Sequence, residues 1–194
     1  MNFLAHLFLS GENEEVMVGN LLGDFMRGRK PGAFREGIAK GISLHRKIDE
    51  FTDNHPLVIK TKHRLRPEFK HYAPVVADVF YDHFLAANFS DYSDISLKDF
   101  AHRCYYVLRK HKELFPPRFQ QALIYMRFRN VLVSYSKLNG MEFAFARMSK
   151  RSNHATNFHN ATKELHKNYD YYYSEFKIFF PELFNYTKEI LDSH

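Results

Sequence analysis

The stretch between residues 45 and 56 carries acids and a histidine at helical spacing. His45 and Asp49 are four residues apart, and Asp53 follows four residues later. On an α-helix, side chains four residues apart approach one another on one face. Imidazole nitrogen and carboxylate oxygen can together bind a divalent metal, and this mixture suits manganese, iron or zinc better than calcium. An ordinary salt-bridged helix face is the alternative that these residues alone leave open.

A second cluster lies at residues 78–85, where acids and a histidine are surrounded by large apolar residues. On a helix, Asp78 and Asp82 share one face, while His83 is rotated from Asp82 by roughly 100°. Carboxylates are costly to bury unless they are paired or coordinated. A capped or ion-paired surface explains one such carboxylate easily, but two acids with a histidine favour a site.

Two further segments each place one chemically capable residue among apolar neighbours. Asp24 follows the small and apolar residues that begin at Gly19, and His6 interrupts the apolar run of residues 2–7. A lone histidine on an apolar face is more often a hydrogen-bonded core residue than a ligand. Together, the four segments supply more acids and histidines than a structural role requires. We predict a metal site and its immediate surroundings from His6, Asp24, His45, Asp49, Asp53, Asp78, Asp82 and His83.

Other catalytic chemistries have little support in the sequence. Cys104 is the only cysteine, so neither an internal disulfide nor a thiolate cluster for zinc can form. Its place on a predicted amphipathic helix indicates a buried, inert thiol rather than a nucleophile. The sequence has no phosphate-binding glycine loop and no serine elbow.

The elements that must position these residues are predicted to be helices. A helix begins at Pro74 and runs through the apolar positions to Leu85, and Ser96 with Asp99 predicts a capped helix that ends at residues 116–117. Further helices are predicted over residues 118–138, stopped near Asn139–Gly140, and over residues 161–180 before Pro181. The aromatic stretch 169–180 is expected mainly in the core. These patterns predict one compact all-α domain over residues 1–194.

The formal net charge of +6 predicts attraction to an anionic partner, which can be nucleic acid, a phosphorylated metabolite or an acidic protein. Five basic residues crowd one segment: Lys60, Lys62, Arg64, Arg66 and Lys70. A solvated helix face is the alternative explanation of such a run. The apolar first ten residues lack the features of a signal peptide and are too short to cross a bilayer. We expect a cytoplasmic protein that does not bind membranes.

The order of these motifs resembles that in the acyl carrier protein phosphodiesterase family, a variant branch of the HD phosphohydrolases. The resemblance rests on residues 2–7, 19–25, 45–54 and 78–85, together with Pro116–Phe119 and Met148–Arg151, and so spans nearly the whole chain. It implies an HD-phosphohydrolase-like helical fold that hydrolyses the phosphodiester joining phosphopantetheine to a serine of holo acyl carrier protein. Manganese is the implied metal, with Mg2+ or Fe2+ as the other candidates. The order Asp82–His83 reverses the pair that gives HD enzymes their name, so ligand roles cannot be copied from them.

Residue clustering and the resemblance together give the predicted roles. The catalytic residues are predicted to be Asp24, His45, Asp78, Asp82 and His83, and the metal ligands to come from His6, Asp24, His45, Asp49, Asp53, Asp78 and Asp82. The basic residues Lys60, Lys62, Arg64, Arg66 and Lys70 are predicted to dock the acidic acyl carrier protein. Two alternatives remain: an HD-type nucleotide phosphohydrolase, and a non-enzymatic basic helical module that binds nucleic acid. The surplus of acids argues against the second, because carboxylates repel phosphate unless a cation lies between them.

Overall fold

The structure, a computed structural model, describes residues 1–26, 34–151 and 157–193, and this part of the chain is helical without a strand. Its α-helices are α1 (Phe3–Phe8), α2 (Glu14–Leu22), α3 (Glu36–Asn54), α4 (Pro56–Phe69), α5 (Ala73–Ala87), α6 (Leu97–Lys110), α7 (Pro117–Phe128), α8 (Val131–Ser134), α9 (Leu138–Arg151), α10 (Ala161–Lys167) and α11 (Tyr169–Asp192). Short 3-10 turns include η1 (Gly23–Phe25), η3 (Lys70–Tyr72), η4 (Phe89–Asp91), η5 (Lys112–Leu114) and η6 (Phe158–Asn160). The predicted all-α class is confirmed. None of the described helices is long and apolar enough to span a membrane.

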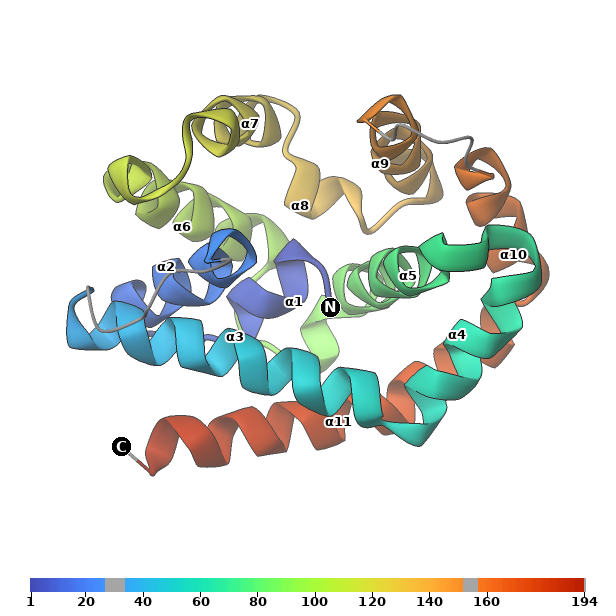
Figure 1. Ribbon diagram of the computed structural model, residues 1–194, viewed down its shortest axis with the longest axis horizontal. Helices are drawn as coiled ribbons and strands as arrows, with labels where there is room; N and C mark the ends of the chain where they lie inside the picture. Colours follow the sequence, from blue (N-terminus) through green and yellow to red (C-terminus); the bar gives the residue numbers. More distant parts are fainter. Residues whose placement is uncertain (27–33, 152–156, 194) are drawn as a thin grey trace.

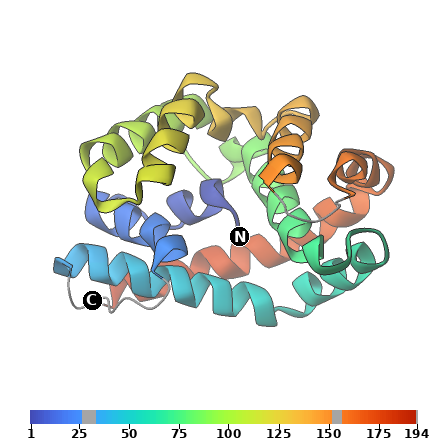
Figure 2. The same cartoon turned by 45° about the horizontal axis from the view of Figure 1, so that its top comes forward.

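The short helix α1 lies near the middle of the molecule, with longer helices around it (Figure 1). Helices α3 and α11 run on one side of α1, and α7, α8 and α9 lie on the other, an arrangement that Figure 2 also shows. Leu4 and Leu7 of α1 are fully buried against this surrounding shell. A six-residue helix is unstable on its own, so packing against its neighbours must hold α1 in place.

The core is rich in aromatic rings, as the sequence predicts. Tyr172, Phe176, Phe179 and Phe180 of α11 are fully buried, and Phe84 of α5 contacts Phe176 with ring centroids 5.5 Å apart. Cys104 is buried in α6, and burial raises the pKa of its thiol to about 12. The expected burial of this thiol is therefore confirmed, and the raised pKa disfavours the reactive thiolate.

The predicted helix starts are confirmed. Pro74 lies in the first turn of α5, where the missing N–H of proline costs no helical hydrogen bond. Ser96 caps α6, because its hydroxyl oxygen accepts a hydrogen bond from the Asp99 backbone N–H at 3.1 Å. The hydroxyl also donates to the Asp99 carboxylate at 2.6 Å. Helix α6 itself ends at Lys110, earlier than the predicted stop at residues 116–117.

The predicted single helix over residues 118–138 is wrong. Helix α7 ends at Phe128, and Asn130 then adopts a left-handed conformation with φ 46° and ψ 51°, which asparagine tolerates better than most residues. Gly140 lies inside α9 rather than at a helix end. A Cβ atom at Gly140 would overlap the backbone carbonyl of Ser134, so this glycine permits close packing of α9 against α8.

The predicted helix over residues 161–180 is also two helices. Helix α10 ends at Lys167, and Asn168 separates it from α11. Helix α11 then continues through Pro181 to Asp192. A proline inside a helix costs about 3 kcal/mol. Phe179 and Leu183, on either side of this proline, are fully buried. Each buried side chain of this size contributes roughly 1.5–3 kcal/mol, so burial on both sides of the proline offsets its cost.

Candidate metal centre

Three side chains from α1 and α3 meet in one cluster. His6, His45 and Asp49 each offer a ligand atom, and these atoms all lie within 4.8 Å of one another. His45 Nε2 is 3.2 Å from one Asp49 oxygen, and His6 Nε2 is 3.3 Å from the other. The two imidazole rings stack with centroids 4.3 Å apart. The predicted approach of His45 and Asp49 on one helix face is thus confirmed, and α1 adds His6 from a distant part of the sequence.

Asn20 of α2 fixes the protonation pattern of His6. The Asn20 amide nitrogen donates to the His6 backbone carbonyl at 2.8 Å and to the Ser10 hydroxyl at 2.9 Å. This orientation turns the amide oxygen of Asn20 toward His6 Nδ1, 2.9 Å away. Nδ1 must then carry the hydrogen, which leaves a lone pair on Nε2. Histidine metal ligands are commonly held through their other ring nitrogen in this way.

The lone pair on His6 Nε2 faces a carboxylate, and this contact needs a positive species. Both His6 Nε2 and the Asp49 oxygen 3.3 Å away are acceptors, so a proton or a cation must lie between them. Burial, the largest influence, lowers the pKa of His6 although the Asp49 carboxylate beside it acts to raise it. A further proton on the ring is therefore disfavoured. A donor set of imidazole nitrogens and carboxylate oxygens fits a divalent cation such as manganese, iron or zinc.

Asp49 stays ionised and reachable from solvent. Burial would raise its pKa, but the contacts with the ring nitrogens of His45 and His6 outweigh burial and hold the pKa well below its usual range. The Asp49 side chain keeps 44% of its surface exposed. A carboxylate that is charged and open on one side can serve both the cluster and an incoming ligand.

Gly23 and Asp24, at the start of η1, lie against His45. A Cβ atom at Gly23 would overlap the His45 ring, so only glycine leaves room for the imidazole. Asp24 Oδ1 is 3.7 Å from His45 Nε2, and the Asp24 side chain is 43% exposed. Asp24 therefore lies at the border of the cluster, within reach of a ligand bound there.

Asp78 lies at another border of the cluster. Its Oδ1 atom is 3.2 Å from the amino nitrogen of Met1, which is in turn 3.9 Å from an Asp49 oxygen. The side chain of Asp78 is 27% exposed. Asp78 thus faces the same positively charged group as Asp49.

The structure does not bring Asp82 or His83 into the cluster. Both Asp82 oxygens accept hydrogen bonds from the first turn of α1, from the backbone N–H of Leu4 at 2.9 Å and of Ala5 at 3.1 Å. Burial, the largest influence, raises the pKa of Asp82 to about 7 against these hydrogen bonds. His83 turns to another side, where its Nδ1 donates to the Tyr135 carbonyl at 2.8 Å. Asp82 thus anchors the helix that carries His6, and His83 anchors the α8 region.

Asp53 also lies apart from the cluster, although it shares α3 with His45. Eight residues along a helix correspond to a rise of about 12 Å. The Asp53 carboxylate is exposed and forms a salt bridge with Lys62 at 2.6 Å. The expected regular face from His45 through Asp53 therefore supplies the cluster only with its first two members.

Most of the basic run on α4 is already paired within the protein. Lys60 and Arg64 contact Glu175 at 3.3 Å and 3.2 Å, and the Arg64 guanidinium lies 3.6 Å from the centre of the Tyr171 ring. Lys62 pairs with Asp53. Arg66 and Lys70 have no ion pair with a described residue and line a pocket at this end of α4. The charges free to attract an anionic partner are therefore fewer than the sequence suggests.

Sequence reasoning missed the roles of Asn20 and Ser10. Asn20 is fully buried in the motif of residues 19–25, and Ser10 donates from its hydroxyl to the His6 carbonyl at 2.7 Å. The available signal was an amide in an otherwise apolar helical segment. A buried amide needs partners, and a nearby histidine is a suitable one.

Comparison with known proteins agrees with the resemblance in the motifs. The acyl carrier protein phosphodiesterase family model matches residues 1–183. Acyl carrier protein phosphodiesterases from Serratia proteamaculans and Escherichia coli are 32% and 34% identical to this chain, over 97% and 94% of it and 98% and 95% of their own lengths. The Photorhabdus laumondii protein of the same name is 30% identical over 93% of this chain and 92% of its own. No solved structure matches. The chain therefore belongs to the acyl carrier protein phosphodiesterase family.

Proposed function

We propose that this protein is a metal-dependent phosphodiesterase that removes phosphopantetheine from holo acyl carrier protein. Family membership supports the substrate, and the cluster of His6, His45 and Asp49 supports the metal. The observation that carries the metal is the contact between His6 Nε2 and Asp49, where two acceptors face each other at 3.3 Å. Manganese is the proposed ion. We also propose the HD-like relationship and the cytoplasmic location that the sequence suggests.

The residues at the cluster divide the work of hydrolysis. His6, His45 and Asp49 would hold a divalent cation, which supplies Lewis-acid activation of the phosphoryl group and of water. Asp24 is placed to accept a proton from the attacking water, because its carboxylate is 43% exposed and adjoins His45. The bond between phosphorus and the serine oxygen breaks. Water supplies the new oxygen on phosphorus and the proton on serine.

The direct test is the intact mass of the carrier protein. Purified holo acyl carrier protein is incubated with this protein and MnCl2, and mass spectrometry follows its conversion to the apo form. A panel of nucleotides in the same buffer tests the alternative substrate class. We expect conversion of the carrier protein and no release of phosphate from nucleotides.

Matched controls distinguish a loss of activity caused by loss of the metal from one caused by unfolding. Chelation with EDTA should stop the conversion, and added Mn2+ should restore it. Asp49→Asn keeps the size of the side chain but removes its charge, so it should be folded and inactive. Nucleotide hydrolysis without carrier protein conversion would replace the proposed substrate.

A further inference from the structure

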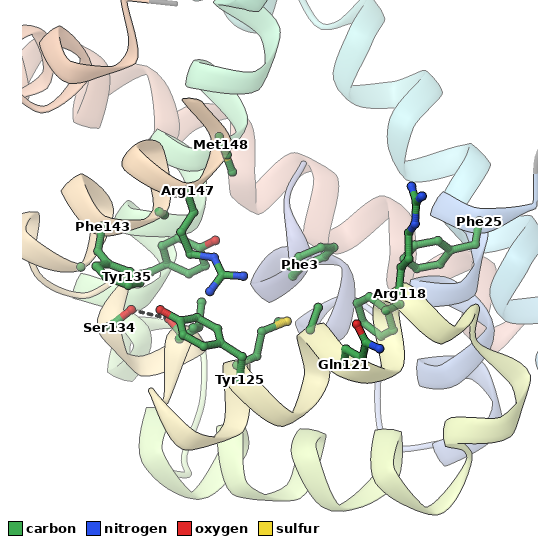
Figure 3. Close-up of a pocket in the computed structure, with 16 residues that line it drawn as sticks. Phe3, Phe25, Arg118, Gln121, Tyr125, Ser134, Tyr135, Phe143, Arg147 and Met148 are labelled. Carbon is green, nitrogen blue, oxygen red and sulfur yellow. Dashed lines mark hydrogen bonds between the residues drawn. The ribbon is translucent and has the colours of Figure 1, made fainter. Parts of the chain in front are cut away.

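A groove of about 590 Å3 lies between the N-terminal part of the chain and the helices α7, α8 and α9 (Figure 3). Its walls are largely apolar and include Phe3, Phe25, Phe119, Met126, Phe143 and Met148. The volume is within the range of about 300–1,000 Å3 that small-molecule sites occupy. The groove has a size and surface suited to a slender, mainly apolar ligand.

The groove adjoins the metal cluster through two short connections. Phe25 lines the groove and directly follows Asp24, which is 3.7 Å from His45. Phe3 lines the groove from α1, the helix that carries His6. Both rings pack on Phe119 of α7, with centroids 4.8 Å and 6.1 Å away. One end of the groove, at Phe3 and Phe25, is therefore built from the same two segments that carry His6 and Asp24, which suits a ligand that spans the groove and the cluster.

Two arginine side chains, Arg147 and Arg118, add positively charged hydrogen-bond donors to this otherwise apolar groove. Arg147 lies 3.7 Å from the centre of the Tyr125 ring, and Figure 3 shows its guanidinium pointing into the groove toward Phe3. Arg118 lies beside Phe25 at the other side of the view. Neither arginine forms an ion pair with a described residue. Their N–H groups are available to carbonyl or phosphate oxygens of a ligand.

We propose that this groove binds the pantetheine arm of the substrate, with the phosphate at the Phe3 and Phe25 end. This inference rests on the proposed function. A carrier-protein phosphodiester joins a broad folded protein to a slender chain, and only the chain fits a groove between helices. The methyl and methylene groups of the arm match the phenylalanine rings, and its amide carbonyls match the guanidinium N–H groups. The groove is thus the subsite for the phosphopantetheine arm, which keeps the phosphorus while the serine leaves, and it sets specificity for the prosthetic group.

Two residues of α7 provide a matched pair of variants. Ala122 lines the groove, whereas Ile124 of the same helix is 74% exposed and does not line it. Ala122→Phe fills the groove, and Ile124→Phe adds a ring to the solvent face. A third variant, Arg147→Ala, removes the guanidinium without adding bulk.

The test measures binding of free 4′-phosphopantetheine, and it does not require turnover. With 13C-labelled methionine methyl groups, NMR should show shifts for Met126 and Met148, which line the groove, and none for the buried Met17 of α2. Ala122→Phe should weaken binding at least about tenfold, a loss of about 1.4 kcal/mol. Arg147→Ala should weaken it less. Ile124→Phe should bind as the wild type does, and Mn2+ affinity should be equal in all four proteins.

The outcomes distinguish this inference from the proposed function. Shifts at Met126 and Met148 without turnover of holo carrier protein would support the groove and overturn the reaction. Turnover with no methyl shift at either methionine, or with full activity and binding in Ala122→Phe, would overturn the groove. If Ala122→Phe does not fold, the wild-type methyl shifts and Arg147→Ala decide the question.

Discussion

Asp49 and Asp82 look alike in the sequence but differ in every contact that they make. Each lies on a helix with a histidine nearby, at i−4 for Asp49 and at i+1 for Asp82. The partners of Asp49 are imidazole nitrogens, and its side chain is 44% exposed. The partners of Asp82 are two backbone N–H groups, and it is fully buried. Whether an acid serves chemistry or architecture is decided by its partners: His6 of α1 and His45 of α3 for Asp49, and the first turn of α1 for Asp82.

The largest effect should come from the histidines of the two regions. His45→Ala removes a group of the cluster, and we expect turnover of holo acyl carrier protein to fall more than about 100-fold, beyond the usual loss for an indirect metal partner. His83→Ala should change turnover far less, because His83 donates its hydrogen bond to the Tyr135 carbonyl and lies outside the cluster. Steady-state kinetics of both variants, with circular dichroism as the folding control, test this. Equal losses of activity would remove the distinction between the two regions.

Asp82→Ala should mainly destabilise the fold. It leaves the N–H groups of Leu4 and Ala5 without their acceptor, and each unsatisfied buried group costs about 1–3 kcal/mol. We expect urea denaturation with EDTA present to show a loss in this range or above. Asp49→Ala, measured in the same way, should lose less, because the Asp49 side chain is 44% exposed, although its depressed pKa means that the ionised carboxylate also stabilises the fold. An Asp82→Ala protein as stable as the wild type would show that α1 does not depend on this anchor.

The pH dependence of stability should differ between Asp82 and its amide. Burial raises the pKa of Asp82 to about 7 in the folded protein, against about 3.9 for an unfolded chain. The folded state thus binds more protons between these values, so the contribution of Asp82 to stability falls as pH rises from about 4 to about 7. The Asp82→Asn side chain does not titrate, so its contribution to stability should not fall over this pH range. Urea denaturation across this window should show the wild type losing stability relative to Asp82→Asn, and a constant difference would mean that the carboxyl titrates normally.

The smallest effect should come from the basic run. Arg66→Glu should raise the Michaelis constant a few-fold at low salt, and added salt should shrink the difference by screening. Arg64→Glu should instead lower stability, because it places a like charge beside Glu175. Kinetics across a salt series, with thermal melts, separate the two. Unchanged kinetics for Arg66→Glu at low salt would place the carrier protein on another surface.

Local patterns could be predicted from the sequence, and partners between distant segments could not. The i, i+4 spacing of His45 and Asp49 and the capping of α6 by Ser96 depend on neighbours along the chain, so both appear in the structure as expected. The hydrogen bond from the Leu4 backbone N–H of α1 to Asp82, by contrast, joins residues 78 positions apart. No periodicity encodes such a contact.

The helix boundaries show the same limit. Asn130 breaks a region that reads as continuous helix, and Gly140 and Pro181 lie inside helices that they seemed to end. In the last two cases tertiary packing outweighs local preference, through close approach to Ser134 and through the buried rings of α11. The order of motifs nevertheless sufficed to identify the family, because it depends on residue identity and not on packing.

The most direct test of the metal centre is Mn2+ binding by wild type and Asp49→Asn, measured by calorimetry alongside turnover of holo acyl carrier protein. The wild type should bind Mn2+, lose turnover on chelation and regain it when Mn2+ is restored. Asp49→Asn should bind Mn2+ at least about tenfold more weakly and should lose turnover, because removal of a charged oxygen ligand weakens the site. Full turnover after complete chelation, or equal Mn2+ affinity in the two proteins, would contradict the assignment of His6, His45 and Asp49 as a metal centre.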